Sequence, residues 1–295
     1  MLSKKEFDIL VAIDEEKETL SQRDLAKITG YSVGTVNSTY AELLEKKLIE
    51  DDKVSATGYD ALEPYRVKRA IFIAAGFGSR MVPITLNTPK PLVRVHGTRI
   101  IDTLLDAVTA AGIEDIIIVR GYLSEQFDQL VYKYPTIKFI ENPMYNEGNN
   151  ITSMMVARYF IDNTYILESD LLINNPKLIK KYQYQSNYLG IPCDRTDDWC
   201  FSVYKNRITG VSVGGTNGCQ MVGISYWTSQ DGKRLGEDIK KVYEQPGGKE
   251  RYWDNVPLTY CKDDFNLVVR PCTFDDIVEI DTFNELKQID HVYNM

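Results

Sequence analysis

Two regions of the chain differ in the spacing of their apolar positions. In the first 65 residues apolar side chains recur at helical spacing, in short pieces. Phe7, Leu10 and Val11 fit one predicted helix, and Ser21 with Asp24 has the spacing of a capping box that opens a second. A longer helix follows a glycine-containing turn and places on one face Val36, Tyr40, Leu43 and Leu44. The polar stretch DDKVSATGYDAL after it predicts a small hairpin.

After Pro64 and a short polar linker, predicted strands alternate with helices. AIFIAA is typical of a buried strand, TRIIDTLLDAVTAAG of a helix that ends at Gly112, and EDIIIVRG of the next strand. The alternation continues through TYILESDLLI. It predicts an α/β fold with a Rossmann-like, doubly wound, mostly parallel sheet. We therefore expect one domain over residues 1–65 and a second over residues 66–295.

The N-terminal region resembles a winged helix-turn-helix, the motif in which a second helix enters the DNA major groove. The resemblance rests on the element order and on SVGTVNSTYAELLEKKLI. Residues 1–65 contain eight Lys and Arg against fourteen Asp and Glu, a balance of 8 − 14 = −6. Duplex binding usually depends on phosphate neutralisation. A dimerisation role, as in a homodimer, or a regulatory role is therefore favoured over DNA binding, which is the alternative.

The residue composition limits the class of protein and the side chains that could carry out catalysis. The net charge of −8 argues against a protein that coats nucleic acid. No apolar run is long enough to span a bilayer, and five scattered cysteines are typical of reduced thiols, so a cytoplasmic protein without a membrane partner is expected. The only histidines are His96 and His291. Carboxylates, lysine and arginine are left to perform any catalysis.

A glycine-rich loop follows the first predicted strand of the sheet, within AAGFGSRMVPITLNTPKPL, residues 74–92. In folds of this class such a loop binds phosphate, because its backbone N–H groups point outward and glycine permits a close approach. The third glycine of a dinucleotide-binding motif is missing, and so is the Gly-Lys-Ser/Thr of a kinase P-loop. Arg80 and Lys90 provide cations instead.

This loop resembles the GxG(S/T)R and PKP(L/A) signature of the nucleoside-triphosphate transferase family, whose fold is of the nucleotide-diphospho-sugar transferase type. In that family a substrate phosphate attacks the α-phosphorus of a metal-bound triphosphate. The resemblance implies that Lys90 and Arg80 are catalytic, with Lys90 stabilising charge at the α-phosphate. It also implies that the triphosphate is bound by Ala75, Gly76, Gly78, Ser79 and Arg80. The alternative is a surface loop with a solvated lysine.

Two aspartates are candidates for holding Mg²⁺, which usually takes one or two protein carboxylates on a nucleotide. Asp170 follows a buried strand, and Asp281 lies between a strand and the last predicted helix. The family has a metal-binding aspartate at each of these places. The alternatives are a turn residue for Asp170 and a helix cap for Asp281.

Aromatic and acidic residues cluster further along the chain, as expected for a cationic head group. GYLSEQFDQL, YNEGNNITSM, RYWDN and VEIDTFNEL resemble segments of the bacterial phosphocholine cytidylyltransferases. The resemblance implies that Asn150 and Ser153 face the nucleotide. It implies a choline pocket lined by Trp199, Tyr252 and Trp253, with Asp254 and Glu279 opposing the charge. The alternatives are core positions for the aromatic residues, surface positions for the acids and a helix cap for Asn150.

The predicted function is therefore the transfer of a cytidylyl group from CTP to phosphocholine, giving CDP-choline and pyrophosphate. The fused N-terminal domain leaves open a related acceptor, 2-aminoethylphosphonate or phosphoethanolamine, in which the ammonium is primary. Two further alternatives are a sugar-1-phosphate nucleotidyltransferase and a transcriptional regulator that uses the transferase fold as a ligand sensor.

Overall fold

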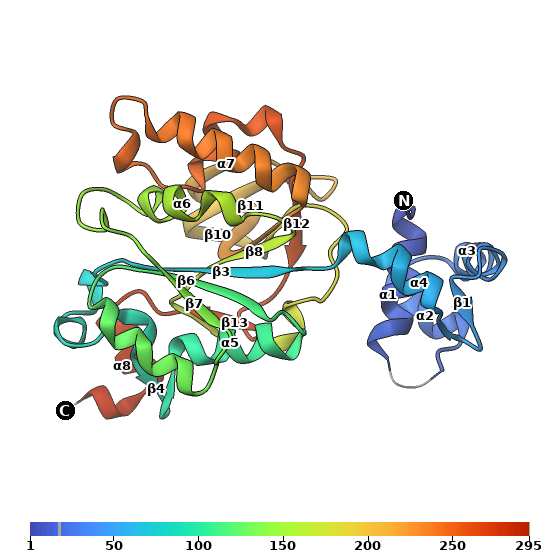
Figure 1. Ribbon diagram of the computed structural model, residues 1–295, viewed down its shortest axis with the longest axis horizontal. Coiled ribbons are helices and arrows are strands. Elements are labelled where there is room, and N and C mark those ends of the chain that lie inside the picture. The colour runs from blue at the N-terminus through green and yellow to red at the C-terminus, as the bar shows by residue number, and fades with distance from the viewer. Residues whose placement is uncertain (17–18, 295) are drawn as a thin grey trace. The chain divides into compact units, whose positions relative to one another are not determined.

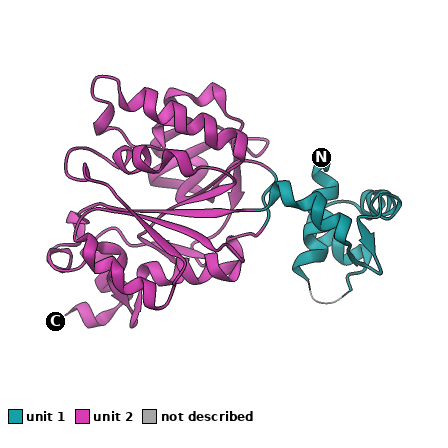
Figure 2. Cartoon of the chain, viewed as in Figure 1, with its two compact units in different colours: residues 1–66, 182–184 teal, residues 67–181, 185–295 magenta. Residues whose placement is uncertain are grey.

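A computed structural model describes residues 1–16 and 19–294 of the protein, which forms two compact units (Figure 2). Unit 1 consists of residues 1–66 and 182–184, and unit 2 of residues 67–181 and 185–295. Unit 1 is therefore built from two separate stretches of the chain. The sequence pattern gave no sign that residues 182–184 belong with the N-terminal region. In the described part of the chain, no helix has the length and apolar character that crossing a membrane requires.

Unit 1 has the element order of a winged helix-turn-helix. Its elements are α1 (Lys4–Glu15), α2 (Gln22–Thr29), α3 (Val33–Glu45), β1 (Ile49–Glu50), β2 (Lys53–Val54) and α4 (Ala56–Leu62). The predicted capping box at Ser21 and Asp24 is confirmed, since each side chain accepts a hydrogen bond from the other's backbone. The prediction for Leu44 was wrong, because it is 47% exposed. The predicted hairpin stretch also contains α4, which begins where Ser55 caps it.

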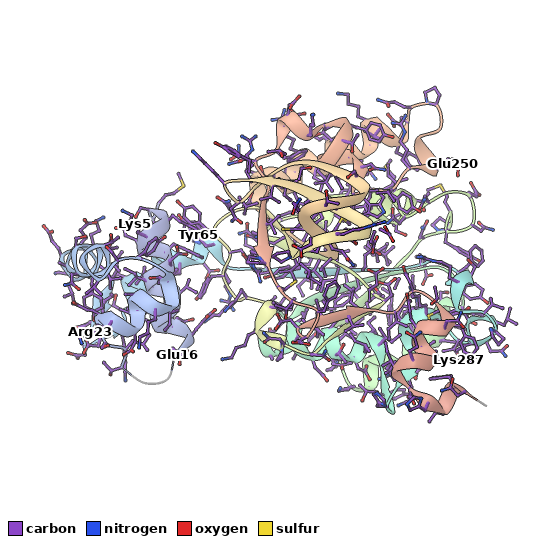
Figure 3. All side chains as sticks on the ribbon, turned by 180° about the vertical axis from the view of Figure 1, so that it is seen from behind. Lys5, Glu16, Arg23, Tyr65, Glu250 and Lys287 are labelled. Atoms are coloured by element: carbon purple, nitrogen blue, oxygen red, sulfur yellow. The ribbon has the colours of Figure 1, made fainter. Side chains whose placement is uncertain are left out.

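An aromatic cluster closes the core of unit 1. The rings of Tyr65, labelled in Figure 3, and Tyr184 stack with centroids 5.4 Å apart and planes within 6°. Phe7 packs against both, at 5.1 Å from Tyr65 and 5.3 Å from Tyr184. The hydroxyl of Tyr184 donates to the carbonyl of Leu2. The segment 182–184 therefore supplies side chains that the N-terminal sequence needs to complete its core.

Unit 2 is organised around a seven-stranded sheet in the order β10-β12-β11-β8-β3-β6-β7. β8, β3, β6 and β7 run parallel, whereas β11 is antiparallel to its neighbours. This arrangement confirms the predicted mixed, mostly parallel sheet. The strands are β3 (Arg69–Ala74), β6 (Asp115–Arg120), β7 (Ile137–Glu141), β8 (Thr164–Glu168), β10 (Asn187–Tyr204), β11 (Arg207–Trp227) and β12 (Val268–Pro271).

Helices cover both faces of this sheet. Successive apolar side chains of the central strands point to opposite faces, so both faces have to be buried. From β3, Ala70 and Phe72 pack towards α5 (Ile100–Ala110), and Ile71 and Ile73 pack towards the other face. That second face is covered by α6 (Ile151–Ala157) and α7 (Ser229–Tyr243), as Figure 1 shows. Between β6 and β7 the chain forms a 3₁₀ helix, Ser124–Tyr132.

Two small sheets and a C-terminal helix complete unit 2. β9 (Leu171–Ile173) pairs antiparallel with β13 (Ile277–Glu279), placing Leu171 opposite Glu279. β4 (Arg94–Val95) pairs with β5 (Thr98–Arg99). The last α-helix is α8 (Phe283–Ile289). The pairing of β9 with β13 joins segments about a hundred residues apart, immediately beside the carboxyl end of β8.

We predict that Tyr184→Ala destabilises unit 1, because it removes one ring from the cluster with Phe7 and Tyr65. The expected loss is roughly 2 kcal/mol of unfolding free energy for this half-buried ring. Denaturant unfolding of the full chain measures it. Tyr132→Ala is the matched control, since Tyr132 is 95% exposed. Equal stabilities of the two variants would contradict the role given to Tyr184.

Candidate active site

The glycine loop leaves the carboxyl end of β3 and turns back across the sheet edge. Gly78 has a left-handed backbone (φ +62°), and a Cβ there would lie 3.0 Å from the Cβ of Lys90. Thr85 holds the loop by donating a hydrogen bond from its hydroxyl to the Gly78 carbonyl, at 2.9 Å. Tyr122 in turn donates to the Thr85 carbonyl. Glycine is thus required both by the turn and by the close passage of the Lys90 segment.

Lys90 lies at the centre of an ion-pair network. Its Nζ is 2.7 Å from Oδ2 of Asp170 and 2.8 Å from Oδ1 of Asp281, and the residue is only 8% exposed. Burial disfavours the ammonium charge, but the two carboxylates more than offset this and raise the pKa of Lys90. Arg80, which is more exposed, forms a bidentate pair with Asp281 at 2.8 and 2.9 Å. Both predicted cations therefore contact predicted metal ligands.

The strand pair β9–β13 brings the two aspartates together. Asp170 immediately precedes β9, and its carbonyl accepts from the N–H of Ile280 at 3.1 Å. Thr282, not Asp281, caps α8 and forms a capping box with Glu285. The helix-cap alternative for Asp281 was therefore wrong, and its carboxylate is left for the cations. Ligand atoms of Asp170, Glu279 and Asp281 all lie within 4.8 Å of one another.

Arg80, Lys90, Asp170 and Asp281 border a cavity of about 350 Å³, whose lining does not include Glu279. Its walls come from the glycine loop, the Lys90 segment, the loop before α6, the end of β8 and Tyr252. The sequence-predicted residues on its lining are Ala75, Gly76, Gly78, Ser79, Arg80, Lys90, Asn150, Ser153, Asp170, Tyr252 and Asp281. Residues separated by some 200 positions in the chain thus meet at the carboxyl edge of the sheet, where ligands bind in open α/β folds.

Asn150 links two walls of the cavity. Its amide Nδ2 donates to Glu168 at 3.3 Å, and its Oδ1 accepts from the N–H of Trp253 at 2.9 Å. Asn150 occupies the N-cap position of α6, but its side chain makes no capping hydrogen bond and is used across the cavity instead. Ser153 is buried, and its hydroxyl accepts from Nδ2 of Asn142 at 3.1 Å. The amide of Asn150 therefore fixes the position of the YWDN segment.

The aromatic candidates differ in exposure: Tyr252 is exposed, Trp199 half-buried and Trp253 buried. Tyr252 is 46% exposed on the cavity lining, and its ring is 5.5 Å from that of Trp199 in an edge-on contact. Trp253 is 2% exposed, packs near-parallel to Tyr188 at 6.3 Å and belongs to the core on the α6–α7 face. Trp253 and Asp254 do not line the cavity. The core alternative thus describes Trp253, because the neighbouring Tyr252 takes the position on the surface.

Glu168 is a cavity residue that the sequence reasoning missed. It ends β8, lines the cavity and accepts from Asn150 and from Nε1 of Trp253 at 3.4 Å. In β8, Ile166 points to the α6–α7 face, so the two-residue period of a strand places Glu168 on that face as well. In TYILESDLL the acid stands two residues after a buried isoleucine, and this spacing is the sequence feature that indicates its position on the same face.

Carboxylates outnumber cations around this cavity. Loss of surrounding water raises the pKa of Glu168 well above its usual range, and the charges of Asp170 and Asp254 add to the effect. Burial also raises the pKa of Asp254 to about 7, although the hydroxyl of Tyr188 donates to it at 3.0 Å. Loss of water, with Asp170 and Asp281 nearby, raises the pKa of Glu279 to about 9. Such a site favours binding of further positive charge.

Comparison with known proteins identifies both units. Residues 69–195 match the family model described as nucleotidyl transferase, and residues 2–54 match the MarR family. The 2-aminoethylphosphonate cytidylyltransferase of Lancefieldella rimae is 37% identical over 228 residues, covering 76% of this chain and 92% of that protein. The choline-phosphate cytidylyltransferase of Haemophilus influenzae is 31% identical, covering 75% of this chain and 95% of that protein.

A solved structure, that of CTP:phosphocholine cytidylyltransferase from Streptococcus pneumoniae, matches with a TM-score of 0.71 and 29% identity. The match covers 77% of this chain and 99% of that one. The chain therefore belongs to the nucleotidyl transferase family and, within it, to the cytidylyltransferases. Its N-terminal unit is a winged-helix domain of the MarR family.

We predict that Gly223→Ala displaces Glu168. A Cβ at residue 223 of β11 would lie 2.5 Å from Cγ and 2.7 Å from Cβ of Glu168, both near the backbone. The expected cost is roughly 1–3 kcal/mol of stability, together with a higher KM for the acceptor. Thermal unfolding and steady-state kinetics measure the two effects. Gly210→Ala, on the same strand but with its nearest neighbour at 4.0 Å, is the control; matching behaviour of the two variants would refute the prediction.

Proposed function

We propose that this cytidylyltransferase joins CTP to a small phosphonate or phosphate that carries a primary ammonium group, with 2-aminoethylphosphonate as the leading acceptor. The sequence-based choice was phosphocholine. The observation that carries the proposal is the half-buried carboxylate of Glu168 on the cavity lining, which has amide and indole donors but no cation partner among the described residues. The name of the Lancefieldella rimae relative supports the same acceptor.

Hydrogen bonding distinguishes the two kinds of acceptor. A primary ammonium has three N–H donors and pairs best with carboxylates, as lysine does. A trimethylammonium has no N–H and is bound through aromatic faces. Here Trp253 is buried, and its indole N–H donates to Glu168, so among the candidate aromatics only Tyr252 lines the cavity. Glu168, with Asp254 close behind it, therefore favours the primary ammonium.

The cations and the loop backbone position the triphosphate for in-line attack. In this proposal the N–H groups of residues 75–80 and the Arg80 guanidinium bind phosphate oxygens. Lys90 directs its ammonium at the α-phosphate and neutralises the charge that develops there. An acceptor oxygen forms a bond to the α-phosphorus, and the bond from that phosphorus to the bridging oxygen breaks to release pyrophosphate. An acceptor phosphonate or phosphate is already anionic at neutral pH, so a general base is not required.

We propose Asp170 and Asp281 as ligands of Mg²⁺, with Glu279 beside them. Their converging oxygens fit a hard divalent cation, and Oδ1 of Asp170 is buried without a hydrogen-bond partner. When bound, Mg²⁺ neutralises triphosphate oxygens. Arg80 and Lys90, which now pair with these aspartates, are the cations nearest to the incoming phosphates.

An acceptor panel tests the proposal. Purified protein with CTP and Mg²⁺ is assayed for pyrophosphate release with 2-aminoethylphosphonate, phosphoethanolamine, phosphocholine and a sugar 1-phosphate. We expect kcat/KM for the primary amines to exceed that for phosphocholine by at least about tenfold, or ~1.4 kcal/mol. A preference for phosphocholine would overturn the acceptor assignment. Turnover with a sugar phosphate alone would overturn the whole class of acceptor.

We also predict that Glu168→Gln raises KM for 2-aminoethylphosphonate by roughly 10- to 100-fold, the effect of losing one charge-assisted hydrogen bond. The KM for CTP should change little, because the substitution keeps the size of the side chain. Glu237→Gln, an exposed position on α7, is the matched control. An unchanged acceptor KM would rule out Glu168 as the ammonium partner.

Lys90→Ala should lower kcat by at least about 100-fold, as expected when a group that stabilises transition-state charge is removed. Asp170 and Asp281 would then face each other without their shared cation, so circular dichroism and the melting temperature must accompany the assay. Lys249→Ala removes a lysine that pairs only at the surface, with Glu147 at 3.4 Å. A Lys90 variant with a native melting profile and normal kcat would exclude the proposed role.

A further inference from the structure

A second convergence of metal-ligand atoms lies away from the cavity, between α7 and the short helices that follow the YWDN segment. Asp238 projects from α7, Cys261 follows the π-helix Val256–Tyr260, and Asp264 ends the 3₁₀ helix Lys262–Asp264. One carboxylate oxygen of each aspartate and the sulfur of Cys261 all lie within 4.8 Å of one another. None of the three residues lines the active-site cavity.

The buried carboxylate of Asp238 is incompletely satisfied. The residue is 8% exposed, and its Oδ2 is inaccessible to solvent with no hydrogen-bond partner. The thiol of Cys261 is close enough to hydrogen-bond to this carboxylate, but a thiol is a weak donor. Burial, with the negative charge of Asp264, raises the pKa of Asp238, and the positive charges of Arg234 and Lys241 offset this only in part. A buried carboxylate in this position usually has a cation or a strong donor as its partner.

Asp264 occupies the open side of the group. It is exposed, and one of its oxygens accepts from Nη2 of Arg234 at 2.7 Å. A carboxylate that is held by arginine through one oxygen can bind a metal through the other, as carboxylate ligands with hydrogen-bonded outer partners do. The open side also leaves room for water, which completes the coordination of three-ligand sites.

We propose that Asp238, Cys261 and Asp264 bind a divalent cation that accepts thiolate, with Zn²⁺ as the best fit. Sulfur donors favour Zn²⁺ over Mg²⁺, and one sulfur with two carboxylate oxygens suits a tetrahedral ion whose fourth ligand is water. Binding removes the proton from Cys261 and gives the buried carboxylate of Asp238 its cation. The site is separate from the Asp170–Asp281 pair, whose donors are oxygen alone.

The proposed ion fastens the segment of residues 252–264 to α7. This segment begins with Tyr252 on the cavity lining. The turn into the π-helix begins at Asp254, whose backbone carbonyl accepts a hydrogen bond from the N–H of Leu258 at 3.1 Å. Because the ion would link Asp238 on α7 to Cys261 and Asp264 at the end of this segment, it would restrain the position of Tyr252 on the cavity lining. The ion is structural and takes no part in the reaction.

Absorption spectroscopy with Co²⁺ tests the site, because Co²⁺ replaces Zn²⁺ at such sites and gives a sulfur-to-metal charge-transfer band only when a thiolate is a ligand. The full-length, reduced protein is titrated with Co²⁺. We expect the band in the native chain and in Cys272→Ser, which removes a different buried cysteine. The band should be absent in Cys261→Ser, and added Zn²⁺ should abolish it in the native chain.

Asp264→Asn provides a variant that keeps the fold, since the side chain is exposed. It should weaken Co²⁺ binding at least about tenfold and leave kcat with saturating Mg²⁺ unchanged. No charge-transfer band in the native chain, or a band that persists in Cys261→Ser, would overturn the proposal and leave a protonated Asp238–Cys261 pair in its place. Loss of catalytic activity in Asp264→Asn with the band intact would likewise contradict it.

Discussion

The ammonium group of Lys90, buried between the carboxylates of Asp170 and Asp281, is the contact on which the arrangement of the active site depends. It joins the glycine loop after β3 to the strand end at β8 and to the approach to α8. Neither an unpaired lysine nor a pair of close aspartates would be stable at this depth, because a buried charge without a partner is strongly disfavoured. The pairing of β9 with β13 and the glycine at residue 78 make the geometry possible.

In the proposed reaction the same groups would have a second use when substrates arrive. Each ion pair joins a cation suited to phosphate with a carboxylate suited to a metal, so a metal-bound triphosphate would take the place of both partners. In the absence of substrate, the ion pairs keep the positive and negative side chains close together. Neither the cations nor the carboxylates are then buried without a partner of opposite charge. Among the described residues, Glu168 and Asp254 form no ion pair of this kind. In the proposed reaction that difference would separate the phosphate end of the cavity from its acceptor end.

The sequence was informative where local chemistry determines structure. Apolar alternation predicted the buried strands, and the GFGSR and PKP segments predicted the loop that borders the cavity. It was less informative where tertiary contacts decide. Whether Trp253 or Tyr252 faces the cavity depends on packing against Tyr188. The position of Asn150 before a helix does not reveal that its amide bridges two walls of the cavity. For Glu168 the only local sign is its two-residue spacing from the buried Ile166, which places it on the α6–α7 face but does not show that a cavity lies there. The long β10–β11 hairpin likewise had no distinctive periodicity.

The aromatic cluster of Phe7, Tyr65 and Tyr184 has a consequence for the order of synthesis. Domains at the N-terminus of a chain usually fold first, as they leave the ribosome. Here residues 1–66 lack part of their core until residues 182–184 have been made, and residues 67–181 are made in between. The winged-helix unit therefore precedes unit 2 in the sequence but can complete its core only after residues 67–181 have been made. A gene fragment that ends between the two family matches would encode the winged-helix unit without residues 182–184.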